Sequence, residues 1–273
     1  MTATAKLERL KGLIGSLDDA VVAYSGGADS AFLADVAHEM LGARAEAVTA
    51  VSPSLAPDER SAARSLALER GWRHREIVTN EIERDGYVRN EADRCYHCKS
   101  ELFDVLAALF PGRQVLVGTN LDDTGDHRPG QAAARERDVR APLLEAGLTK
   151  EEIRALSRAR GLSSWDKPAS ACLASRIAYG VEVTAERLDR VARAESFLRS
   201  LGLRQLRVRD HGELARIEVP ADEVALIASD PVRDEVASFM RGLGFAYVTL
   251  DLEGFRSGSM NALLQIGRRE EGG

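Results

Sequence analysis

Two hydrophobic periods alternate along the first half of this chain of 273 residues. Short apolar runs of β-favouring residues are separated by segments in which apolar residues recur at helical spacing. Strands and helices that alternate in this way predict a parallel sheet flanked by helices, with right-handed crossovers. The runs predicted as strands are 21–24, 45–51, 76–79 and 114–118, and the predicted helices include 1–17, 57–70, 94–110 and 149–161.

The pattern changes after Arg176. The stretch 165–176 has neither a helical nor a strand period, and its Trp, Leu and Cys content argues against disorder. The elements predicted beyond it are a helix at 184–201, strands at 205–209 and 214–219, a helix at 231–243 and a strand at 245–250. We therefore expect an α/β protein with a Rossmann-like domain at 1–176 and a smaller α/β domain at 177–273.

Charged residues share one face of the hairpin predicted at 205–219. Strand alternation places four of them there, namely Arg207, Arg209, Arg216 and Glu218. In the simplest register Arg207 lies opposite Arg216, which is unfavourable unless an anion lies between them; the alternative is a solvated face. Glu195 falls within the apolar stripe of the helix predicted at 184–201. A carboxylate in that position needs an ion partner, a metal or a cavity edge, unless it lies at the margin of the stripe.

The segment Ser25-Gly26-Gly27-Ala28-Asp29-Ser30 joins the first predicted strand to a helix. Its glycines let backbone N–H groups approach an anion, and the positive end of the helix dipole favours phosphate. Ser25 and Ser30 add hydroxyl donors, and Asp29 beside a phosphate implies an intervening Mg²⁺. The loop is neither a Walker A loop nor a dinucleotide fingerprint, and the plain alternative is a glycine-rich turn without a ligand.

Other polar residues follow the predicted strands at the same edge of the sheet, where parallel sheets bind their ligands. Asp122 and Asp123 are adjacent carboxylates that could hold Mg²⁺ on a triphosphate or, alternatively, form an Asx turn in a solvated loop. We expect ATP to bind along this edge. The further candidate residues for binding it are Ser52, Gly118, Thr119, Asn120 and Asp123.

Composition limits the classes of partner. The chain has 37 basic and 43 acidic residues and a formal net charge of −6, which argues against a large nucleic-acid surface. No apolar run approaches the length that crosses a membrane, and residues 1–17 lack the apolar core of a signal peptide. We expect a cytoplasmic protein that binds small molecules and neither nucleic acid nor membrane.

Three cysteines, Cys95, Cys98 and Cys172, carry further candidate chemistry. Without a secretory signal they indicate a reducing compartment, and therefore metal binding or catalysis in place of a disulfide framework. Cys95 and Cys98 begin a predicted helix and can point at one metal. Close to Cys172, Ser175 and Arg176 offer a hydroxyl and a guanidinium suited to a phosphate.

Taken together, these motifs resemble the LarE family of ATP-dependent sulfur transferases, which act in nickel-pincer nucleotide synthesis. The resemblance covers nearly the whole chain. The loop 25–30 is similar to the PP-loop of the ATP pyrophosphatase superfamily, and Ser-Arg at 175–176, Arg-Val-Arg at 207–209 and Gly-Phe-Arg-Ser-Gly at 254–258 narrow it to this family. The other matching segments are 118–120, 128–130, 167–176 and 251–261.

The resemblance implies both a reaction and its residues. A pyridinium biscarboxylate mononucleotide is activated on a carboxylate by ATP with release of pyrophosphate, and sulfur then displaces AMP to leave a thiocarboxylate. The residues that would hold the triphosphate are Ser25, Gly26, Gly27, Asp29 and Ser30. The residues that would hold the phosphate of the substrate are Ser175, Arg176, Arg207 and Arg209, and Arg256 is a further substrate-binding candidate. Glu195 and Glu218 match carboxylates of the family's metal or substrate site. The resemblance also implies a homo-oligomer, a hexamer.

One departure from the family pattern concerns the sulfur source. Some members give up the sulfur of a single cysteine at the position that is Ala171 here, whereas Cys172 lies one residue later. Cys95 and Cys98 match members in which three cysteines carry a [4Fe-4S] cluster, and three thiolates leave one iron open to bind hydrosulfide. The alternatives are zinc, held by the three cysteines with or without His97, and ordinary thiols with Cys172 as the lone donor.

Two rival functions remain open at this stage. The first is a tRNA thiolase or another PP-loop amidating enzyme, although a tRNA thiolase needs an extended basic face. The second is a non-catalytic adenine-nucleotide sensor or iron–sulfur carrier. Pyrophosphate release that depends on substrate would exclude the second function, and salt-dependent retention on tRNA would favour the first.

Overall fold

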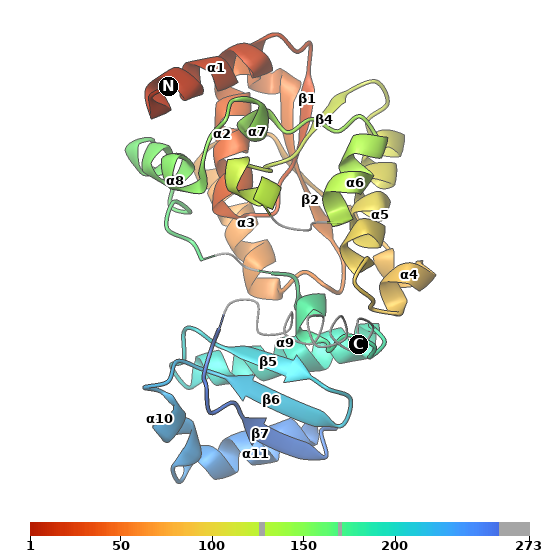
Figure 1. The fold of residues 1–273 in the computed structure, drawn as a ribbon, viewed down its shortest axis with the longest axis vertical. Coiled ribbons are helices and arrows are strands. Elements are labelled where there is room, and N and C mark those ends of the chain that lie inside the picture. Colours follow the sequence, from red (N-terminus) through yellow and green to blue (C-terminus); the bar gives the residue numbers. More distant parts are fainter. Residues whose placement is uncertain (126–128, 169–170, 257–273) are drawn as a thin grey trace, which may run out of the picture. The chain divides into compact units, whose positions relative to one another are not determined.

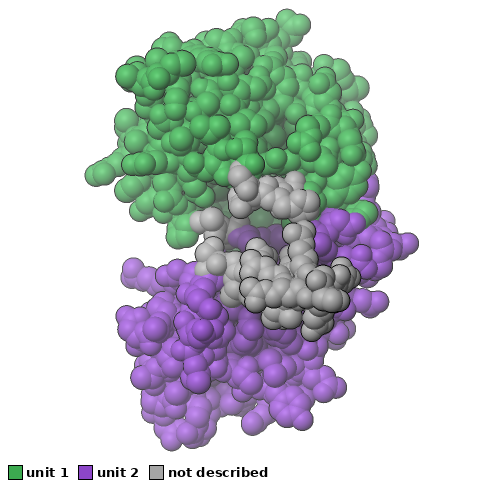
Figure 2. Space-filling view, in the orientation of Figure 1, with its two compact units in different colours: residues 1–81, 95–170 green, residues 82–94, 171–273 purple. Residues whose placement is uncertain are grey.

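The structure is a computed structural model, and it describes residues 1–125, 129–168 and 171–256. The chain divides into two compact units, which Figure 2 colours separately. Unit 1 consists of residues 1–81 and 95–170, and unit 2 of residues 82–94 and 171–273. The hydrophobic pattern gave no sign that residues 82–94 belong with the C-terminal part of the chain. Among the described residues, no helix is both long and apolar enough to cross a membrane.

Unit 1 is built on a four-stranded parallel sheet, as the alternating pattern predicted (Figure 1). Its strands are β1 (Ala20–Ala23), β2 (Ala45–Val51), β3 (His74–Val78) and β4 (Gln114–Leu116), in the order β3-β2-β1-β4. Because β1 pairs with β2 on one side and with β4 on the other, the chain switches direction across the sheet at β1. Ligands of such sheets bind at the carboxyl ends of the strands beside this switch point.

The helices of this half of the chain are α1 (Ala3–Gly15), α2 (Ala28–Leu41), α3 (Pro57–Glu69), α5 (Arg94–Leu109), α6 (Pro129–Glu136), α7 (Pro142–Glu145) and α8 (Lys150–Ala159). Short 3₁₀ turns lie at η1 (Gly42–Arg44), η2 (Glu81–Glu83) and η3 (Leu121–Gly125). Helix α8, predicted at 149–161, begins with a capping box between Thr149 and Glu152. Helix α6 begins at Pro129, because proline suits the first turn of a helix; Arg128 lies outside the described residues.

Strand β1 shows why both faces of the sheet are covered. Val22 packs into a core formed with α1, α2, α3 and α8, whereas its neighbour Val21 packs into a second core with α5 and α6. Successive side chains of a strand point to opposite faces, so a strand buried on both sides is apolar throughout. Burial of this kind fixes the end of β1, from which the loop at 25–30 departs.

Unit 2 has a three-stranded sheet in the order β5-β6-β7, in which β5 and β6 are antiparallel and β6 and β7 are parallel (Figure 1). Its elements are α4 (Asp85–Val88), η4 (Leu173–Arg176), α9 (Ala185–Ser200), β5 (Arg207–Asp210), β6 (Leu214–Glu218), α10 (Val224–Ala228), α11 (Val232–Gly242) and β7 (Tyr247–Leu250). The predicted apolar face is confirmed, because Val208 and Ile217 pack with Leu198 of α9 and Met240 of α11.

The register predicted for the hairpin is wrong by two residues. Arg207 lies opposite Glu218, and it is Arg209 that lies opposite Arg216. The three residues 211–213 connect the strands, and within them Gly212 adopts a φ of +86° while its N–H donates to the Asp210 carboxylate at 2.8 Å. A shift of two residues keeps every side chain on its predicted face, so the pattern of alternation could not detect it.

Candidate active site

The loop at 25–30 leaves β1 and enters α2 at the switch point of the sheet. Gly27 is the N-cap of α2 and supplies no capping side chain, so the first turn of the helix is open to an anion. The two serine hydroxyls shape the loop, since Ser30 Oγ lies 3.1 Å from Ser25 Oγ, accepts from Ser25 N at 3.2 Å and donates to Gly27 O at 3.2 Å.

Two glycines allow the close packing that this loop requires. Gly26 has a φ of +77°, and a Cβ there would lie 2.9 Å from the Cβ of Ala63 in α3. A Cβ on Gly118, which follows β4, would lie 2.9 Å from the backbone nitrogen of Ser30. The segment after β4 therefore lies directly against the start of α2, and the two predicted nucleotide-binding segments meet.

Two polar atoms at this junction are buried without a hydrogen-bond partner among the described residues. They are Oδ1 of Asp29 and Nδ2 of Asn120, whose residue is fully buried. Burial raises the pKa of Asp29 above its usual range, and the adjacent side chain of Asn120, which falls short of hydrogen-bond geometry, opposes this rise. A buried carboxylate oxygen and a buried amide donor without partners are costly unless a ligand completes them. The site thus offers one group suited to a cation and one suited to an anion, as Mg²⁺ and a phosphate would require.

The carboxylates of Asp122 and Asp123 hold the backbone around them. Asp122 accepts from the N–H of Lys150 at 2.6 Å, and Asp123 accepts from the N–H of Asn120 at 3.0 Å. The Asn120 side chain accepts in turn from Asp122 N at 3.0 Å. These bonds favour the alternative in which the segment forms an Asx-type turn, with Asp122 linked to the start of α8.

Ser52 also faces the protein. Its hydroxyl and that of Ser54 each donate to Oε1 of Glu81 at 2.5 Å, and Thr79 Oγ1 donates to Oε2 at 3.0 Å. Glu81 is only 3% exposed and ties the ends of β2 and β3 together. Glu81 was not among the residues predicted from the sequence, where the available signal was a carboxylate two residues after the end of a predicted strand. Because its hydroxyl proton is engaged by Glu81, Ser52 could contact a nucleotide only through its backbone or through a lone pair of its hydroxyl oxygen.

The two cysteines of unit 1 begin α5. Cys95 is exposed and Cys98 is half-buried, and the two lie one helical turn apart on the same side of the helix. Cys172 belongs to unit 2, where it is exposed and forms the N-cap of η4. Among the described residues, no group of three or more His, Cys, Asp or Glu side chains forms a metal-binding cluster. Shared ligation by the three cysteines stays a prediction.

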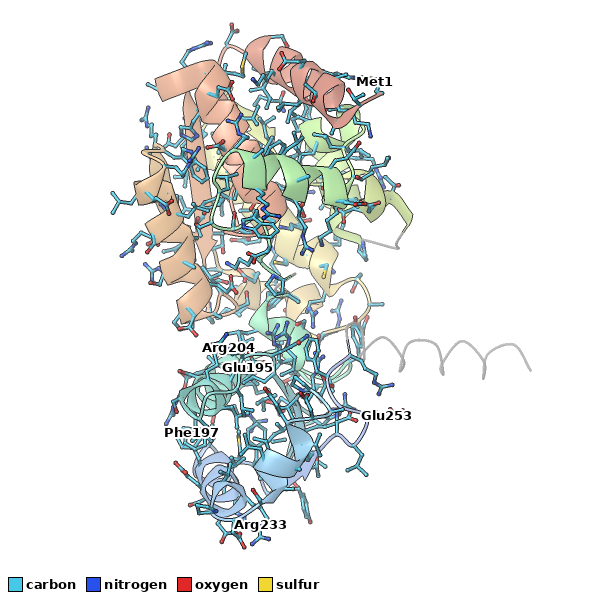
Figure 3. All side chains as sticks on the ribbon, turned by 90° about the vertical axis from the view of Figure 1, so that its left-hand side faces the viewer. Met1, Glu195, Phe197, Arg204, Arg233 and Glu253 are labelled. Atoms are coloured by element: carbon cyan, nitrogen blue, oxygen red, sulfur yellow. The ribbon has the colours of Figure 1, made fainter. Side chains whose placement is uncertain are left out.

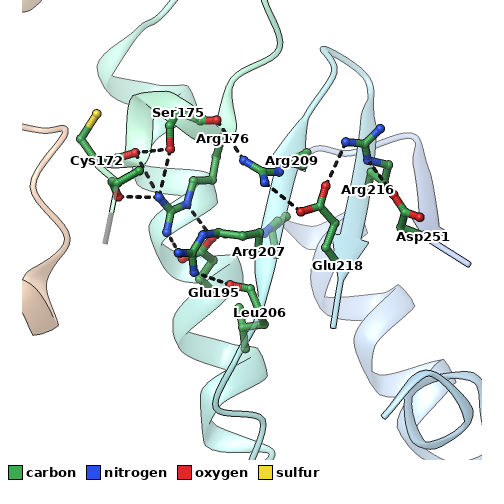
Figure 4. A network of polar contacts seen from close by, with 12 residues as sticks. Cys172, Ser175, Arg176, Glu195, Leu206, Arg207, Arg209, Arg216, Glu218 and Asp251 are labelled. Carbon is green, nitrogen blue, oxygen red and sulfur yellow. Dashed lines mark hydrogen bonds and ion pairs between the residues drawn. The ribbon is translucent and has the colours of Figure 1, made fainter. Parts of the chain in front are cut away.

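The predicted substrate residues of unit 2 form a network of buried ion pairs (Figure 4). Arg176 donates through Nε to Glu195 Oε1 at 2.9 Å, and its NH1 group bonds the carbonyl of Ala171 and the hydroxyl of Ser175. Glu195 accepts further bonds from Arg199 at 3.1 Å and from the N–H of Val208 at 3.2 Å. Glu195 is therefore a paired buried carboxylate, one of the outcomes that its position in the apolar stripe allowed.

A second buried carboxylate separates the opposed arginines of the hairpin. Glu218 is fully buried and accepts from Arg209 at 2.8 Å and from Arg216 at 2.9 Å. Arg209 also donates to the carbonyl of Ser175 at 3.1 Å. The like charges of Arg209 and Arg216 are thus balanced by a carboxylate of the protein, and the pair does not require an anion from outside.

Arg207 differs from the other arginines of this network. Its guanidinium donates to the carbonyl of Leu206 at 2.7 Å and lies over the ring of Phe255, 5.2 Å from its centre. Among the described residues it forms no ion pair with a carboxylate. Burial, together with the neighbouring charge of Arg176, lowers the pKa of Arg207 to about 10. Arg256, by contrast, is exposed and ion-paired with Glu253, and the remainder of its motif, 257–261, lies outside the described residues.

A cavity of unit 1 lies away from the loop at 25–30. It has a volume of about 660 Å³, and its lining includes charged residues from the far end of α2, from the segment after α3 and from the C-cap of α8. Asp35 accepts there from Arg70 at 2.8 Å and from Arg160 at 2.6 Å, and Arg160 also pairs with Glu39 at 2.7 Å. Because these charges compensate one another, we place the chemistry at the loop, where polar atoms lack partners, and not in this cavity.

Comparison with known proteins gives two relatives that match nearly the whole chain and one that matches part of it. No family model matches the chain. It is 48% identical over 263 residues to the uncharacterized protein slr1717 of Synechocystis sp., covering 95% of this chain and 98% of that protein. It is 37% identical over 269 residues to pyridinium-3,5-bisthiocarboxylic acid mononucleotide synthase of Lactiplantibacillus plantarum, covering 96% of each. The uncharacterized protein MJ0830 of Methanocaldococcus jannaschii is 31% identical over 179 residues, 64% of this chain and 69% of that protein.

Proposed function

Because the chain belongs to the LarE family of sulfur-transferring synthases, we propose that it converts a carboxylate of pyridinium-3,5-biscarboxylic acid mononucleotide into a thiocarboxylate at the expense of ATP. The full-length match to a synthase named for the bisthiocarboxylic product is the observation that carries this proposal. The product would serve nickel-pincer nucleotide synthesis.

The proposed reaction has two steps. A substrate carboxylate oxygen attacks the α-phosphorus of ATP, the bond to the bridging oxygen breaks, and pyrophosphate leaves with that electron pair. A sulfur nucleophile then attacks the acyl carbon of the adenylate, and AMP leaves. The open first turn of α2 and the unpartnered Nδ2 of Asn120 support triphosphate binding, and Oδ1 of Asp29 would hold the Mg²⁺ that neutralises it.

Arg207 is the group best suited to the phosphate of the substrate mononucleotide. It is half-buried and forms no ion pair with a carboxylate among the described residues, although the charge of Glu195 lies nearby, whereas Arg176 and Arg209 are each bonded to a buried glutamate. A phosphate monoester would supply the missing negative charge through charge-assisted hydrogen bonds. The main role of the ion-paired residues is then to hold the structure around Arg207 in place, which narrows the roles that the resemblance implies. These residues are Arg176, Arg209, Glu195 and Glu218.

The reaction is tested by following ATP, AMP and pyrophosphate with and without the biscarboxylate mononucleotide. We expect AMP and pyrophosphate in equal amounts, formed only when the substrate is present. Formation of ADP, or nucleotide binding without turnover, would contradict the proposal, and the second result would favour a nucleotide sensor. Stimulation by tRNA in place of the mononucleotide would favour the tRNA thiolase.

A matched pair of variants tests the assignment of Arg207. The variant Arg207→Gln removes the unpaired charge, and Arg204→Gln removes an exposed arginine three residues earlier (Figure 3). We expect Arg207→Gln to raise the KM for the mononucleotide about tenfold or more, since a charged hydrogen bond to phosphate is lost, while the KM for ATP stays unchanged. Equal behaviour of the two variants would remove Arg207 from the substrate site.

The sulfur source is tested by the metal content of protein purified without oxygen. Cys95, Cys98 and Cys172 would hold a [4Fe-4S] cluster, which supplies an open iron at which hydrosulfide can bind. We expect iron and sulfide with little zinc, and loss of both in Cys98→Ser. Zinc without sulfide would support the zinc alternative, and sulfur lost from Cys172 after one turnover, seen by mass spectrometry, would support a sacrificial thiol. We also propose the homo-hexamer implied by the family, which light scattering would test.

A further inference from the structure

Lys167 lies beside the loop at 25–30, although the stretch that contains it has no regular secondary structure. Its ammonium group donates to the carbonyl of Gly26 at 3.0 Å and pairs with Glu59 of α3 at 2.6 Å. Its backbone is held as well, since Lys167 N donates to Ser164 O at 3.1 Å. A lysine held at both ends places a positive charge at the edge of the loop, within one hydrogen bond of its backbone.

Arg154 reaches the same place from α8. One of its terminal nitrogens donates to the carbonyl of Lys167 at 3.2 Å. Its Nε–H is buried and has no hydrogen-bond partner among the described residues, and no carboxylate of these residues forms an ion pair with it. A buried guanidinium N–H without an acceptor is costly, so the geometry calls for an acceptor that the described residues do not supply.

Two cations of α8 lie near the unpartnered carboxylate of the loop. They are Lys150 and Arg154, and both are close enough for their positive charges to act on Asp29. The loop is thus bordered by positive side chains from α8 and from the segment after it, in addition to the backbone N–H groups of α2. The sequence analysis gave no role to Lys167 or Arg154.

We propose that Lys167 and Arg154 bind the β- and γ-phosphates of ATP and stabilise pyrophosphate as it leaves. This inference rests on the proposed function. When the bond between the α-phosphorus and its bridging oxygen breaks, negative charge grows on that oxygen and on the β-phosphate. N–H donors of Lys167 and Arg154, already fixed next to the loop, would stabilise this charge by hydrogen bonds without having to move. Glu59 acts as a positioning residue that holds the lysine.

A purely structural role for Lys167 would be to fasten the loop to α3 through Glu59. The two roles differ in what they predict for pyrophosphate. If Lys167 only holds the loop, replacing it lowers the stability of the fold. If Lys167 binds phosphate, replacing it lowers the affinity for inorganic pyrophosphate even when the stability of the variant equals that of a control variant.

Lys11 and Arg158 provide the controls. Lys11 pairs with Glu39 at 2.8 Å, and the exposed fraction of its side chain, 22%, nearly equals the 21% of Lys167, but it lies near the opposite end of α2. Arg158 lies one turn after Arg154 on α8, where it is exposed over the ring of Trp165. The four variants are therefore Lys167→Met with Lys11→Met, and Arg154→Met with Arg158→Met.

The experiment is titration of inorganic pyrophosphate with Mg²⁺ into the full-length protein, with thermal unfolding measured alongside. We expect Lys167→Met and Arg154→Met each to weaken pyrophosphate binding about tenfold or more, and Lys11→Met and Arg158→Met to leave it within twofold. Lys167→Arg should restore part of the affinity, because it keeps the charge and changes the geometry. The same variants should lower the rate of pyrophosphate formation more than they raise the KM for the mononucleotide.

Each outcome decides the matter. If the wild-type protein does not bind pyrophosphate, or if Lys167→Met binds it as the wild type does, the inference is overturned. If Lys167→Met and Lys11→Met lose pyrophosphate affinity only in proportion to an equal loss of folding stability, the role of Lys167 is purely structural and the inference is overturned. Pyrophosphate binding that depends on both cations, in a protein that forms no AMP from ATP, would sustain this subsite and overturn the proposed function.

Discussion

The buried glutamates of unit 2 and the loop at 25–30 of unit 1 differ in how their buried charges are partnered. In unit 2, Glu195 and Glu218 are each surrounded by hydrogen-bond donors from arginines of the same unit. In unit 1, Asp29 keeps a buried oxygen without a partner among the described residues, and Arg154 keeps a buried N–H without one. A satisfied network stabilises a fold, whereas an unsatisfied group marks a place where a ligand completes the structure. The comparison assigns a mainly structural role to one set of charges and a binding role to the other.

The largest effect is expected from Glu195→Gln, which breaks the satisfied network. It leaves the buried guanidinium of Arg176 without its carboxylate, and loss of one partner of a buried pair costs about 3–5 kcal/mol of the free energy of unfolding. Urea denaturation together with hydrogen exchange at the amides of β5 and β6 measures this loss. The control is Asp189→Asn on the same helix, whose exposed pair with Arg193 at 3.7 Å should contribute less than about 0.5 kcal/mol. A loss below about 1 kcal/mol in Glu195→Gln would show that the network is not structural.

The next largest effect is expected from Asp29→Asn, which should reduce activity and not stability. We expect the rate of pyrophosphate formation to fall about 100-fold or more, because the proposed Mg²⁺ ligand is lost. Stability should stay equal or rise by about 1 kcal/mol, since a buried carboxylate oxygen without a partner is removed. Initial rates and thermal unfolding measure the two effects, with Asp18→Asn as an exposed control. A variant that loses stability while keeping its activity would reverse the roles that we assign to the two units.

Gly118→Ala tests whether the two nucleotide-binding segments must touch. The added Cβ would meet the backbone nitrogen of Ser30 at 2.9 Å, so the start of α2 or the end of β4 must move. We expect at least a tenfold rise in the KM for ATP, because the N–H groups of the loop would be displaced. Gly12→Ala in α1 meets no atom within 4 Å and should leave the KM unchanged while stabilising α1 by about 0.5–1 kcal/mol. Normal ATP kinetics in Gly118→Ala would mean that the loop tolerates the displacement.

The smallest effect concerns a surface ion pair of unit 1. Hydrogen bonds from Arg60 and Arg64 lower the pKa of Glu76 to about 2 from 4.5. A carboxyl group whose pKa is lower in the folded state stabilises the fold above its unfolded pKa, and this contribution disappears as the pH falls from about 4.5 to about 2. Because both arginines are largely exposed, we expect no more than about 1 kcal/mol. The difference in unfolding free energy between the wild type and Glu76→Gln should therefore shrink over this pH range.

The sequence alone was sufficient to predict the parallel sheet of unit 1 and the position of the loop that follows β1. Strand–helix alternation predicts a parallel sheet, and a Ser-Gly-Gly turn between strand and helix predicts an anion site, because both depend on local spacing and backbone freedom. The apolar face of the hairpin in unit 2 was predicted for the same reason. Its register was not, because a shift of two residues leaves every side chain on the same face.

Tertiary structure decided which of the polar residues are free to act. From the sequence, Arg176, Arg207 and Arg209 were equivalent candidates for a phosphate, and Glu195 was either paired or a ligand. Only the fold brings Glu195 to Arg176 and Glu218 to Arg209, leaving Arg207 without a carboxylate partner among the described residues. Likewise, only the fold brings Lys167 to the carbonyl of Gly26, 141 positions earlier in the chain. The physical reason is that neutralisation of a charge depends on distances of a few ångströms between segments far apart in sequence, which periodicity and composition do not encode.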